Sequence, residues 1–463
     1  MLHLILTFFP YGLLMYFAYR FYREPIYLLG VVFLIFFRYC ILFESVRVFW
    51  VFGRLGQDIL LLLWYIFFWA IILIRVNTVR DYPFIKNNER KSYLPTDYFI
   101  GGLMLISVLD LVLVTREFYS IENVFTQFFT LFSLFLGYFL IKTLVRLVDA
   151  ETLKEFLFAI VAVNTLACVL FILHQGLQIS IFTGEEYSEE YFEGVLITRT
   201  FWFIPILLLF SVAYLFTFFD KQKKALYITM LAINFMAIFI SYNRSTLINA
   251  LLIYFLLTWL KAYKEKQVST IIKNFMLIGV MGVVFFFAVS TFLPANTKFF
   301  MSRFEDLKDS PRDEESNTLV YRFARTSEVF EQMDANKAMF GFGPVTSSQM
   351  PWVETMTATT ADMAWAGVAF RWGFMGLILV VLTYIVSLFS TYKLFMQSEG
   401  LTASLALLFF LVITSQVIEG FTSYTFMARD RYAMGFWYLG IAAALVQGLA
   451  HNKSEQEETS EDE

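Results

Sequence analysis

Long apolar runs recur along the whole chain, and only short polar breaks separate most of them. A run of about 20 apolar residues is long enough to cross a bilayer as an α-helix, which satisfies its own backbone polar groups. The pattern therefore predicts an all-α, polytopic membrane protein with about 12–13 transmembrane helices. The predicted spans are residues 4–19, 26–43, 58–74, 97–114, 121–141, 155–173, 200–219, 225–241, 246–260, 273–292, 364–391, 401–418 and 432–450.

One long polar interruption, residues 293–363, divides this pattern. It predicts an outward-facing loop that contains short helices and caps a site. N-terminal transmembrane helices in residues 1–292 precede the loop, and C-terminal transmembrane helices in residues 364–450 follow it. The acidic residues 451–463 are predicted to form a disordered tail.

Within the loop, the charged segment around Pro311 is predicted to be coil, because Pro opposes helix continuation. A helix is predicted to follow, with Asn317 as its N-cap. Gly341 is predicted to end that helix, and the turn Gly341-Phe-Gly-Pro344 contains residues that tolerate unusual backbone angles.

Lys and Arg residues gather in every second short loop, which predicts that those loops are cytoplasmic. The basic loops are residues 75–91, 142–154, 221–224 and 261–266. The alternation places the C-terminal tail in the cytoplasm as well. The outward-facing elements are then the acidic loop around Glu186, the break at Asn243, the loop of residues 293–363 and residues 419–431.

The composition agrees with a membrane chain and excludes several functions. Hydrophobic residues make up 59% of the sequence and charged residues 16%, whereas charged residues approach about a quarter of a soluble domain. The formal net charge of −4 does not favour nucleic-acid binding. The three histidines are scattered, and no grouping of His, Cys, Asp and Glu residues predicts a metal site. No Gly-rich phosphate loop indicates ATP or a nucleotide sugar, so no cofactor is expected.

Arg244 lies between two apolar runs, in the sequence Ser241-Tyr-Asn-Arg244-Ser-Thr. A charge at that depth is unfavourable unless it is paired or faces a cavity, so Arg244 is a candidate functional residue. An interfacial anchor whose guanidinium reaches lipid phosphates explains the residue equally well. Both interpretations stay open on the residue alone.

Three further arginines, Arg199, Arg322 and Arg325, are predicted to share the outward side with Arg244. Taken alone, Arg199 is better explained as an anchor at the start of a span. Arg322 and Arg325 share one face of the predicted loop helix, because they are three residues apart. One guanidinium group can donate two parallel hydrogen bonds to phosphate oxygens, and several arginines would suit a diphosphate. The four arginines are therefore predicted to bind and stabilise a diphosphate leaving group.

Asp362 stands directly before the point where the chain re-enters the membrane. The residue type favours a helix N-cap, because an Asp side chain stabilises the first turn of a helix. The alternative is a catalytic carboxylate that accepts a proton from an attacking hydroxyl.

Arg371 is predicted to lie inside the membrane, within the span of residues 364–391. An intramembrane charge is expected to have a partner. Glu328 and Glu419 are the candidate acidic partners.

Proline is scarce inside the predicted spans, where Pro10 and Pro205 are the clear cases. Transporters commonly build their sites from helices broken at Gly and Pro. The scarcity therefore weighs modestly against a transporter.

Taken in order, several short motifs resemble the O-antigen ligase and O-antigen polymerase superfamily of bacterial envelope enzymes. The segment around Arg244 resembles the family's Ser-x-Ser-Arg stretch, and Arg199 occupies the position of its earlier outward-facing Arg. Arg322 precedes the Gly341-x-Gly turn, as in the family's Arg…Gly-x-Gly stretch. Asp362 and the Gly373-Phe-Met-Gly376 segment complete the resemblance, which covers about residues 194–392.

This resemblance implies a metal-independent membrane glycosyltransferase of the GT-C type in the bacterial inner membrane, with its active face periplasmic. Such enzymes take a glycan from an undecaprenyl diphosphate donor. The ligase branch transfers the finished chain to lipid A core, and the polymerase branch transfers a growing chain to another lipid-linked repeat unit. Ligases of the family typically carry His at the position of Asp362, which favours the polymerase branch. The alternative from another functional class is a transporter of lipid-linked glycans.

Overall fold

A computed structural model of the chain describes residues 93–114, 135–146, 148–177, 187–192, 194–200, 204–241, 244–266, 293–309, 335–341, 364–422 and 435–448, with isolated residues elsewhere. The chain divides into two compact units. Unit 1 comprises Met1–Tyr39, Val46–Phe156 and Arg325–Glu463. Unit 2 comprises Cys40–Ser45 and Leu157–Ala324.

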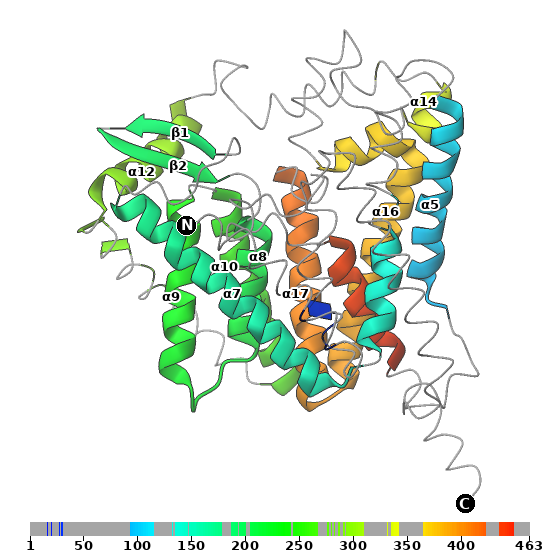
Figure 1. Cartoon of the computed structure of the whole chain (residues 1–463), viewed down its shortest axis with the longest axis horizontal. Helices are drawn as coiled ribbons and strands as arrows, with labels where there is room; N and C mark the ends of the chain where they lie inside the picture. The colour runs from blue at the N-terminus through cyan, green and yellow to red at the C-terminus, as the bar shows by residue number, and fades with distance from the viewer. Residues whose placement is uncertain are drawn as a thin grey trace, which may run out of the picture. The chain divides into compact units, whose positions relative to one another are not determined.

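The described part of unit 1 is helical. It contains α5 (Pro95–Val114), α14 (Ala335–Phe340), α16 (Ala364–Gln397), α17 (Gly400–Thr422) and the unlabelled helices Phe135–Val145 and Gly435–Gly448. The long helix α16 packs against both α5 and α17 (Figure 1). Gly102 allows α5 to approach α16 closely, because a Cβ atom at this position would lie 3.0 Å from a methyl carbon of Leu379 on α16.

Unit 2 combines apolar helices with a short β-hairpin. Most of α7 (Ala150–Leu177) belongs to it, together with α8 (Ile204–Thr217), α9 (Lys224–Ile240), α10 (Arg244–Glu265) and α12 (Pro294–Asp309). The hairpin consists of β1 (Tyr187–Phe192) and β2 (Val195–Thr200). Helix α8 packs against α9 and α10.

Four of the described helices are long and apolar enough to cross a membrane, namely Ala150–Gln175, Ser245–Glu265, Trp365–Gln397 and Gly400–Phe421. The prediction of an all-α, polytopic membrane protein is confirmed. The predicted spans 4–19, 26–43 and 58–74 lie outside the described residues apart from single positions. The total of about 12–13 spans therefore stays a prediction.

The hairpin is a local exception to the all-α prediction, since the acidic stretch was expected to be a loop. The strands are antiparallel, and Ser188 pairs with Arg199 while Glu189 pairs with Thr198. Gly194 has φ +79° at the turn, a conformation that favours glycine. Four of the six residues of the second strand are β-branched, namely Val195, Ile197, Thr198 and Thr200. Such residues favour a pleated ribbon, which explains why this stretch does not remain irregular.

Helix α16 is broken at Gly373, which has φ 62° and ψ −169°. The rings of Trp365 and Tyr384 lie only 5.9 Å apart, centroid to centroid. In a straight helix these residues would be separated by about 28 Å, at 1.5 Å per residue. The segment before Gly373 therefore folds back along the longer segment after it. The predicted span of residues 364–391 is not one straight helix.

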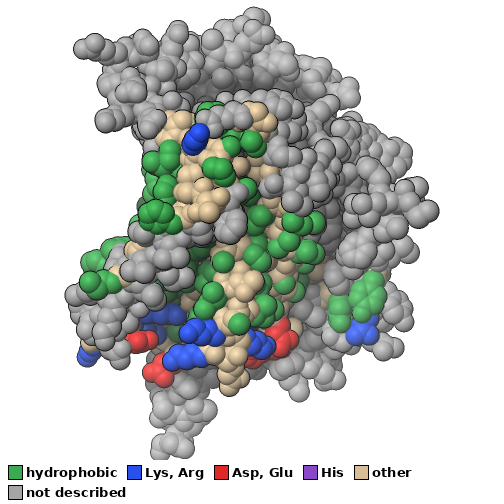
Figure 2. All heavy atoms as spheres, turned by 90° about the vertical axis from the view of Figure 1, so that its left-hand side faces the viewer, with side chains coloured by type: hydrophobic (Ala, Val, Ile, Leu, Met, Phe, Trp, Pro, Cys, Tyr) green, Lys and Arg blue, Asp and Glu red, His purple; other side chains and the backbone are tan. Residues whose placement is uncertain are grey.

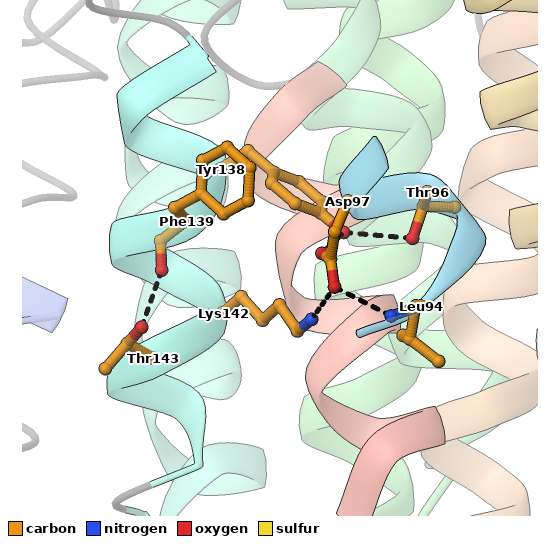
Figure 3. Close-up of polar contacts among 7 residues, drawn as sticks. All are labelled: Leu94, Thr96, Asp97, Tyr138, Phe139, Lys142 and Thr143. Carbon is orange, nitrogen blue, oxygen red and sulfur yellow. Dashed lines mark hydrogen bonds and ion pairs between the residues drawn. The ribbon is translucent and has the colours of Figure 1, made fainter. Parts of the chain in front are cut away.

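A buried ion pair joins α5 to the helix Phe135–Val145 in unit 1 (Figure 3). The Lys142 Nζ atom lies 2.6 Å from Asp97 Oδ2, and the Tyr138 hydroxyl donates to Asp97 Oδ1 at 2.9 Å. The Leu94 amide also donates to Asp97 Oδ2, at 2.8 Å, as in the reciprocal half of a capping box. Lys142 was expected in a short cytoplasmic loop, but it lies in a helix and its side chain is buried.

In unit 2, buried polar side chains join three apolar helices. Asn164 of α7 donates to Ser211 of α8 at 3.0 Å and to Asn234 of α9 at 3.1 Å. Asn234 in turn donates to Thr165 at 2.9 Å. A polar group in an apolar interior stabilises the packing only when its hydrogen bonds are made, and both of these side-chain amides are bonded.

One outer face of the molecule carries a band of hydrophobic side chains, and its lower edge is lined with charges (Figure 2). Exposed apolar side chains of α9 and α10 include Leu226, Ile228, Ile248, Leu251 and Trp259. Exposed charges at the α8–α9 turn and the end of α10 include Lys221, Lys223, Lys224, Glu265 and Lys266. Two of the predicted basic loops therefore lie at the same end of unit 2, next to a surface suited to lipid.

Candidate functional site

Two of the predicted diphosphate-binding arginines belong to unit 2. Arg199 lies on β2, opposite Ser188 in the hairpin register. Arg244 is the first residue of α10, and the first turn of that helix contains no acidic residue. A positive side chain at a helix N-terminus is unfavourable for the helix dipole unless an anion is close by. The position of Arg244 therefore suits an anion-binding residue better than a helix-stabilising one.

Aromatic contacts connect the hairpin to the end of the helix before Arg244. Phe192 of β1 lies 5.3 Å from Phe299 of α12, centroid to centroid. The next residue of α12, Phe300, lies 4.4 Å from Phe239 in the last turn of α9. The strands, α12 and the end of α9 thus form one continuous packed region (Figure 1). The backbone positions of Arg199 and Arg244 both adjoin this region.

The other three predicted site residues, Arg322, Arg325 and Asp362, lie outside the described residues. Their roles stay predictions. Asp362 precedes the first residue of α16 by two positions. In the sequence, Asp362 therefore lies just before the N-terminus of the broken helix.

The two glycine motifs of unit 1 meet backbone to backbone. Helix α14 ends at Phe340, and Gly341 follows with φ +81°, so the prediction that Gly341 ends a helix is confirmed. A Cβ atom on Gly341 would lie 2.6 Å from the Gly373 nitrogen and would also overlap the Arg371 carbonyl. A Cβ atom on Gly373 would lie 2.5 Å from the Phe340 nitrogen and would overlap the Met339 carbonyl. Only glycine fits at either position, so the end of α14 is fixed to the break in α16.

The folded-back start of α16 also packs against the end of α17. The Trp365 indole N–H donates to the Val417 carbonyl at 3.4 Å, and the Trp365 ring lies 5.8 Å from the Phe421 ring. On the other side, Trp365 contacts Tyr384, whose hydroxyl donates to Gln416 Oε1 at 3.4 Å. Between these contacts, Glu419 of α17 is 1% exposed. The Trp365 cluster is defined as Trp365, Tyr384, Gln416, Glu419 and Phe421.

Another feature that the sequence did not indicate is Asn249, five residues after Arg244 on α10. Its side chain is 1% exposed, and neither amide atom has a hydrogen-bond partner in the described structure. By contrast, the side-chain amides of Asn164 and Asn234 make hydrogen bonds. The sequence did not predict this buried amide, because an Asn within an apolar run forms no recognisable motif.

A metal centre needs several ligands close together. Among the described residues, no group of three or more His, Cys, Asp and Glu side chains is arranged to hold a metal ion.

The order of the motifs and their geometry can be compared with known families. Residues 228–381 match the O-antigen ligase family. The O-antigen ligase match begins in α9 and ends in α16, so it includes Arg244, Gly341 and Gly373. The resemblance to the O-antigen ligase and polymerase superfamily is confirmed. A comparison with curated proteins finds no match.

The O-antigen ligase match and the apolar helices together support a membrane enzyme of the ligase and polymerase type, which takes part in polysaccharide biosynthesis. Lipid-linked glycan and acceptor substrates in general follow from the same match. Arg199 lies on the N-terminal side of the matched residues, and the α17 part of the Trp365 cluster lies on their C-terminal side.

Proposed function

We propose that this protein is a membrane glycosyltransferase that moves a glycan from an undecaprenyl diphosphate donor to an acceptor hydroxyl. The observation that carries the proposal is the O-antigen ligase match across α9, α10, α12, α14 and the break in α16. The proposed setting is the bacterial inner membrane, with the active face periplasmic, the C-terminus cytoplasmic and residues 293–363 over the site. The proposed product is an O-antigen or other surface polysaccharide made by polymerisation.

Arg244 is the centre of the proposed donor site. The backbone N–H groups of a helix N-terminus and a guanidinium both favour an anion, and α10 begins at Arg244. A diphosphate carries enough oxygens for several guanidinium groups to bind it. Arg199, Arg322 and Arg325 are the proposed further contacts.

In the proposed reaction, an acceptor hydroxyl attacks the anomeric carbon of the donor sugar. The bond from this carbon to the diphosphate oxygen breaks, and its electron pair leaves with the diphosphate. The arginines stabilise the charge that develops on the leaving group. The hydroxyl proton passes to a carboxylate, for which Asp362 is the proposed residue unless it acts only as a helix cap.

A ligase that transfers the chain to lipid A core fits the same donor chemistry. The Asp at position 362 is the feature that favours polymerase, since the resembling ligases typically have His there. The two activities differ in the acceptor alone, so the acceptor decides between them.

Transport of a lipid-linked glycan is the alternative from another class, and one observation favours it. Transporters build substrate sites at broken helices, and α16 is broken at Gly373. This break counts in favour of a transporter, whereas the scarcity of Pro in the predicted spans weighs modestly against one.

Purified protein in nanodiscs with a defined undecaprenyl diphosphate oligosaccharide tests the proposal. A ladder of products supports a polymerase, and a single transfer that requires lipid A core supports a ligase. The absence of any covalent change with either acceptor refutes the glycosyltransferase and favours transport.

Substitutions at the proposed site sharpen that test. Arg244→Ala is expected to abolish product formation without loss of protein from the membrane. Lys221→Ala is the matched control, because it removes a positive charge at the opposite end of α9. Near-normal turnover in Arg244→Ala would remove the centre of the proposal. Full turnover in Asp362→Asn would restrict Asp362 to a capping role, and Asp362→His tests the residue found in ligases.

A further inference from the structure

The Trp365 cluster contains a hydrogen-bond donor that packing leaves without an acceptor. Gln416 is 3% exposed, and its Oε1 atom accepts from Tyr384. Its Nε2 atom is buried and has no partner in the described part of the chain. An unsatisfied buried donor is energetically unfavourable. A ligand that supplies an acceptor would remove this penalty.

A buried carboxylate follows that donor about one turn later on α17. Glu419 follows Gln416 by three residues on α17, so the two side chains project from the same face of the helix. Trp365 contacts α17 at Val417 and Phe421, on either side of Glu419, and so fixes the level at which the carboxylate lies. An amide donor next to carboxylate acceptors matches a hydroxyl group, which both accepts and donates.

Aromatic rings complete the arrangement. The rings of Trp365 and Phe421 are inclined at 42°, and the Phe421 side chain is exposed. The C–H face of a sugar ring packs well on aromatic rings, while its hydroxyl groups need polar partners. Aromatic side chains combine a large apolar surface with a defined geometry, which favours such a ligand.

We propose that the Trp365 cluster is a carbohydrate subsite, which binds one sugar ring of the acceptor glycan. Gln416 Nε2 donates to a sugar oxygen, the Glu419 carboxylate accepts from a sugar hydroxyl, and the ring packs against Trp365 and Phe421. This inference rests on the proposed function. It assigns binding of the acceptor glycan to the Trp365 cluster. The donor diphosphate remains with the arginines.

The competing explanation is that Glu419 acts only as the ion-pair partner of Arg371. Removing the charge of Glu419 would then destabilise the protein, because a buried charge loses its partner. The same substitution would leave sugar binding unchanged. The two explanations therefore separate when stability and sugar binding are measured on the same variants.

The experiment uses the full-length protein in nanodiscs and follows thermal unfolding. The ligands are a panel of neutral, N-acetylated and acidic monosaccharides at millimolar concentration and, separately, undecaprenyl diphosphate. A ligand that binds only the folded protein raises its unfolding temperature. At least one sugar is expected to do so with the wild-type protein.

Glu419→Gln and Trp365→Leu are each expected to weaken the response to that sugar at least about ten-fold in apparent affinity. Both variants should keep the wild-type response to undecaprenyl diphosphate. Trp365→Phe keeps an aromatic ring and should retain binding, which covers the case in which Trp365→Leu does not fold. Tyr98→Phe is the matched control, because Tyr98 is exposed on α5 and lies outside the Trp365 cluster.

Two results would overturn the subsite: a wild-type protein that responds to no sugar, or a Glu419→Gln variant that binds sugar as the wild type does. Failure of the proposed function has a different signature. In that case the wild-type protein would not respond to undecaprenyl diphosphate, whatever its response to sugars.

Discussion

Gly373→Ala is the substitution whose effect follows most directly from the geometry. Gly373 has φ 62° and ψ −169°, a region that is essentially restricted to glycine. Holding an alanine there is unfavourable by about 1–3 kcal/mol. The new methyl would also overlap the Met339 carbonyl and lie 2.5 Å from the Phe340 nitrogen. Overpacking of this kind adds about 1–3 kcal/mol, so a total loss of roughly 2–6 kcal/mol is expected.

Two other glycines of unit 1 separate the two contributions. Gly400 has φ +60°, but a Cβ atom there would have no heavy atom within 4 Å. Gly400→Ala should therefore show the backbone term alone, about 1–2 kcal/mol. Gly101 lies in α5 with no positive φ and no neighbour within 4 Å. Gly101→Ala should stabilise the helix slightly, by about 0.5–1 kcal/mol.

The assay is thermal unfolding of the three variants in the same detergent, followed by the loss of monodisperse protein in size-exclusion chromatography. The expected order of stability is Gly101→Ala, then Gly400→Ala, then Gly373→Ala. If Gly373→Ala unfolds no earlier than Gly400→Ala, the backbone contact between α14 and α16 does not exist as described. Gly341→Ala should match Gly373→Ala, since each glycine faces the backbone of the other segment.

Three further predictions concern stability. Asp97→Leu should destabilise unit 1 by about 3–5 kcal/mol because Lys142 is left buried without its carboxylate, and the double variant with Lys142→Met should recover part of this loss in a denaturation assay. Asn234→Leu should lower the unfolding temperature because the buried hydrogen bonds of Asn234 with Asn164 and Thr165 are lost, whereas Asn249→Leu should leave the temperature unchanged or raise it, since no hydrogen bond is lost. The side-chain and backbone hydrogen bonds from Thr152 lower the pKa of Asp149. The stability from this cap is present above the unfolded-state pKa of about 3.9 and is lost as pH falls through the lower folded-state pKa. When the pH is lowered from neutral to ~3, the stability measured by unfolding should therefore fall more in the wild type than in Asp149→Asn.

The membrane helices could be predicted from the sequence because apolar runs have few alternatives in lipid. The predicted spans 155–173, 225–241 and 401–418 fall within α7, α9 and α17 to within a residue or so. The helix end at Gly341 was predictable for a similar reason, since a positive φ is a local property of glycine. These features depend on short stretches of chain.

The remaining features depend on contacts between distant residues. Lys142 resembled an exposed loop cation, and only the position of Asp97 shows that it is buried and paired. The break at Gly373 could not be distinguished from an ordinary helical glycine without Met339 and Phe340 against it. Gln416 and Glu419 carry no motif, and they gain significance only because Trp365 folds back onto α17.

The break in α16 also reduces the mismatch between the length of this helix and the thickness of the bilayer core. As one straight helix, its 34 residues would extend about 51 Å, beyond a bilayer core of about 30 Å. Residues 374–397 alone give about 36 Å, a length that a modest tilt accommodates. The nine residues before the break are too short to cross the bilayer core as a helix. Only one crossing by α16 therefore counts toward topology, and the segment before the break is available to line a surface within the leaflet that it occupies.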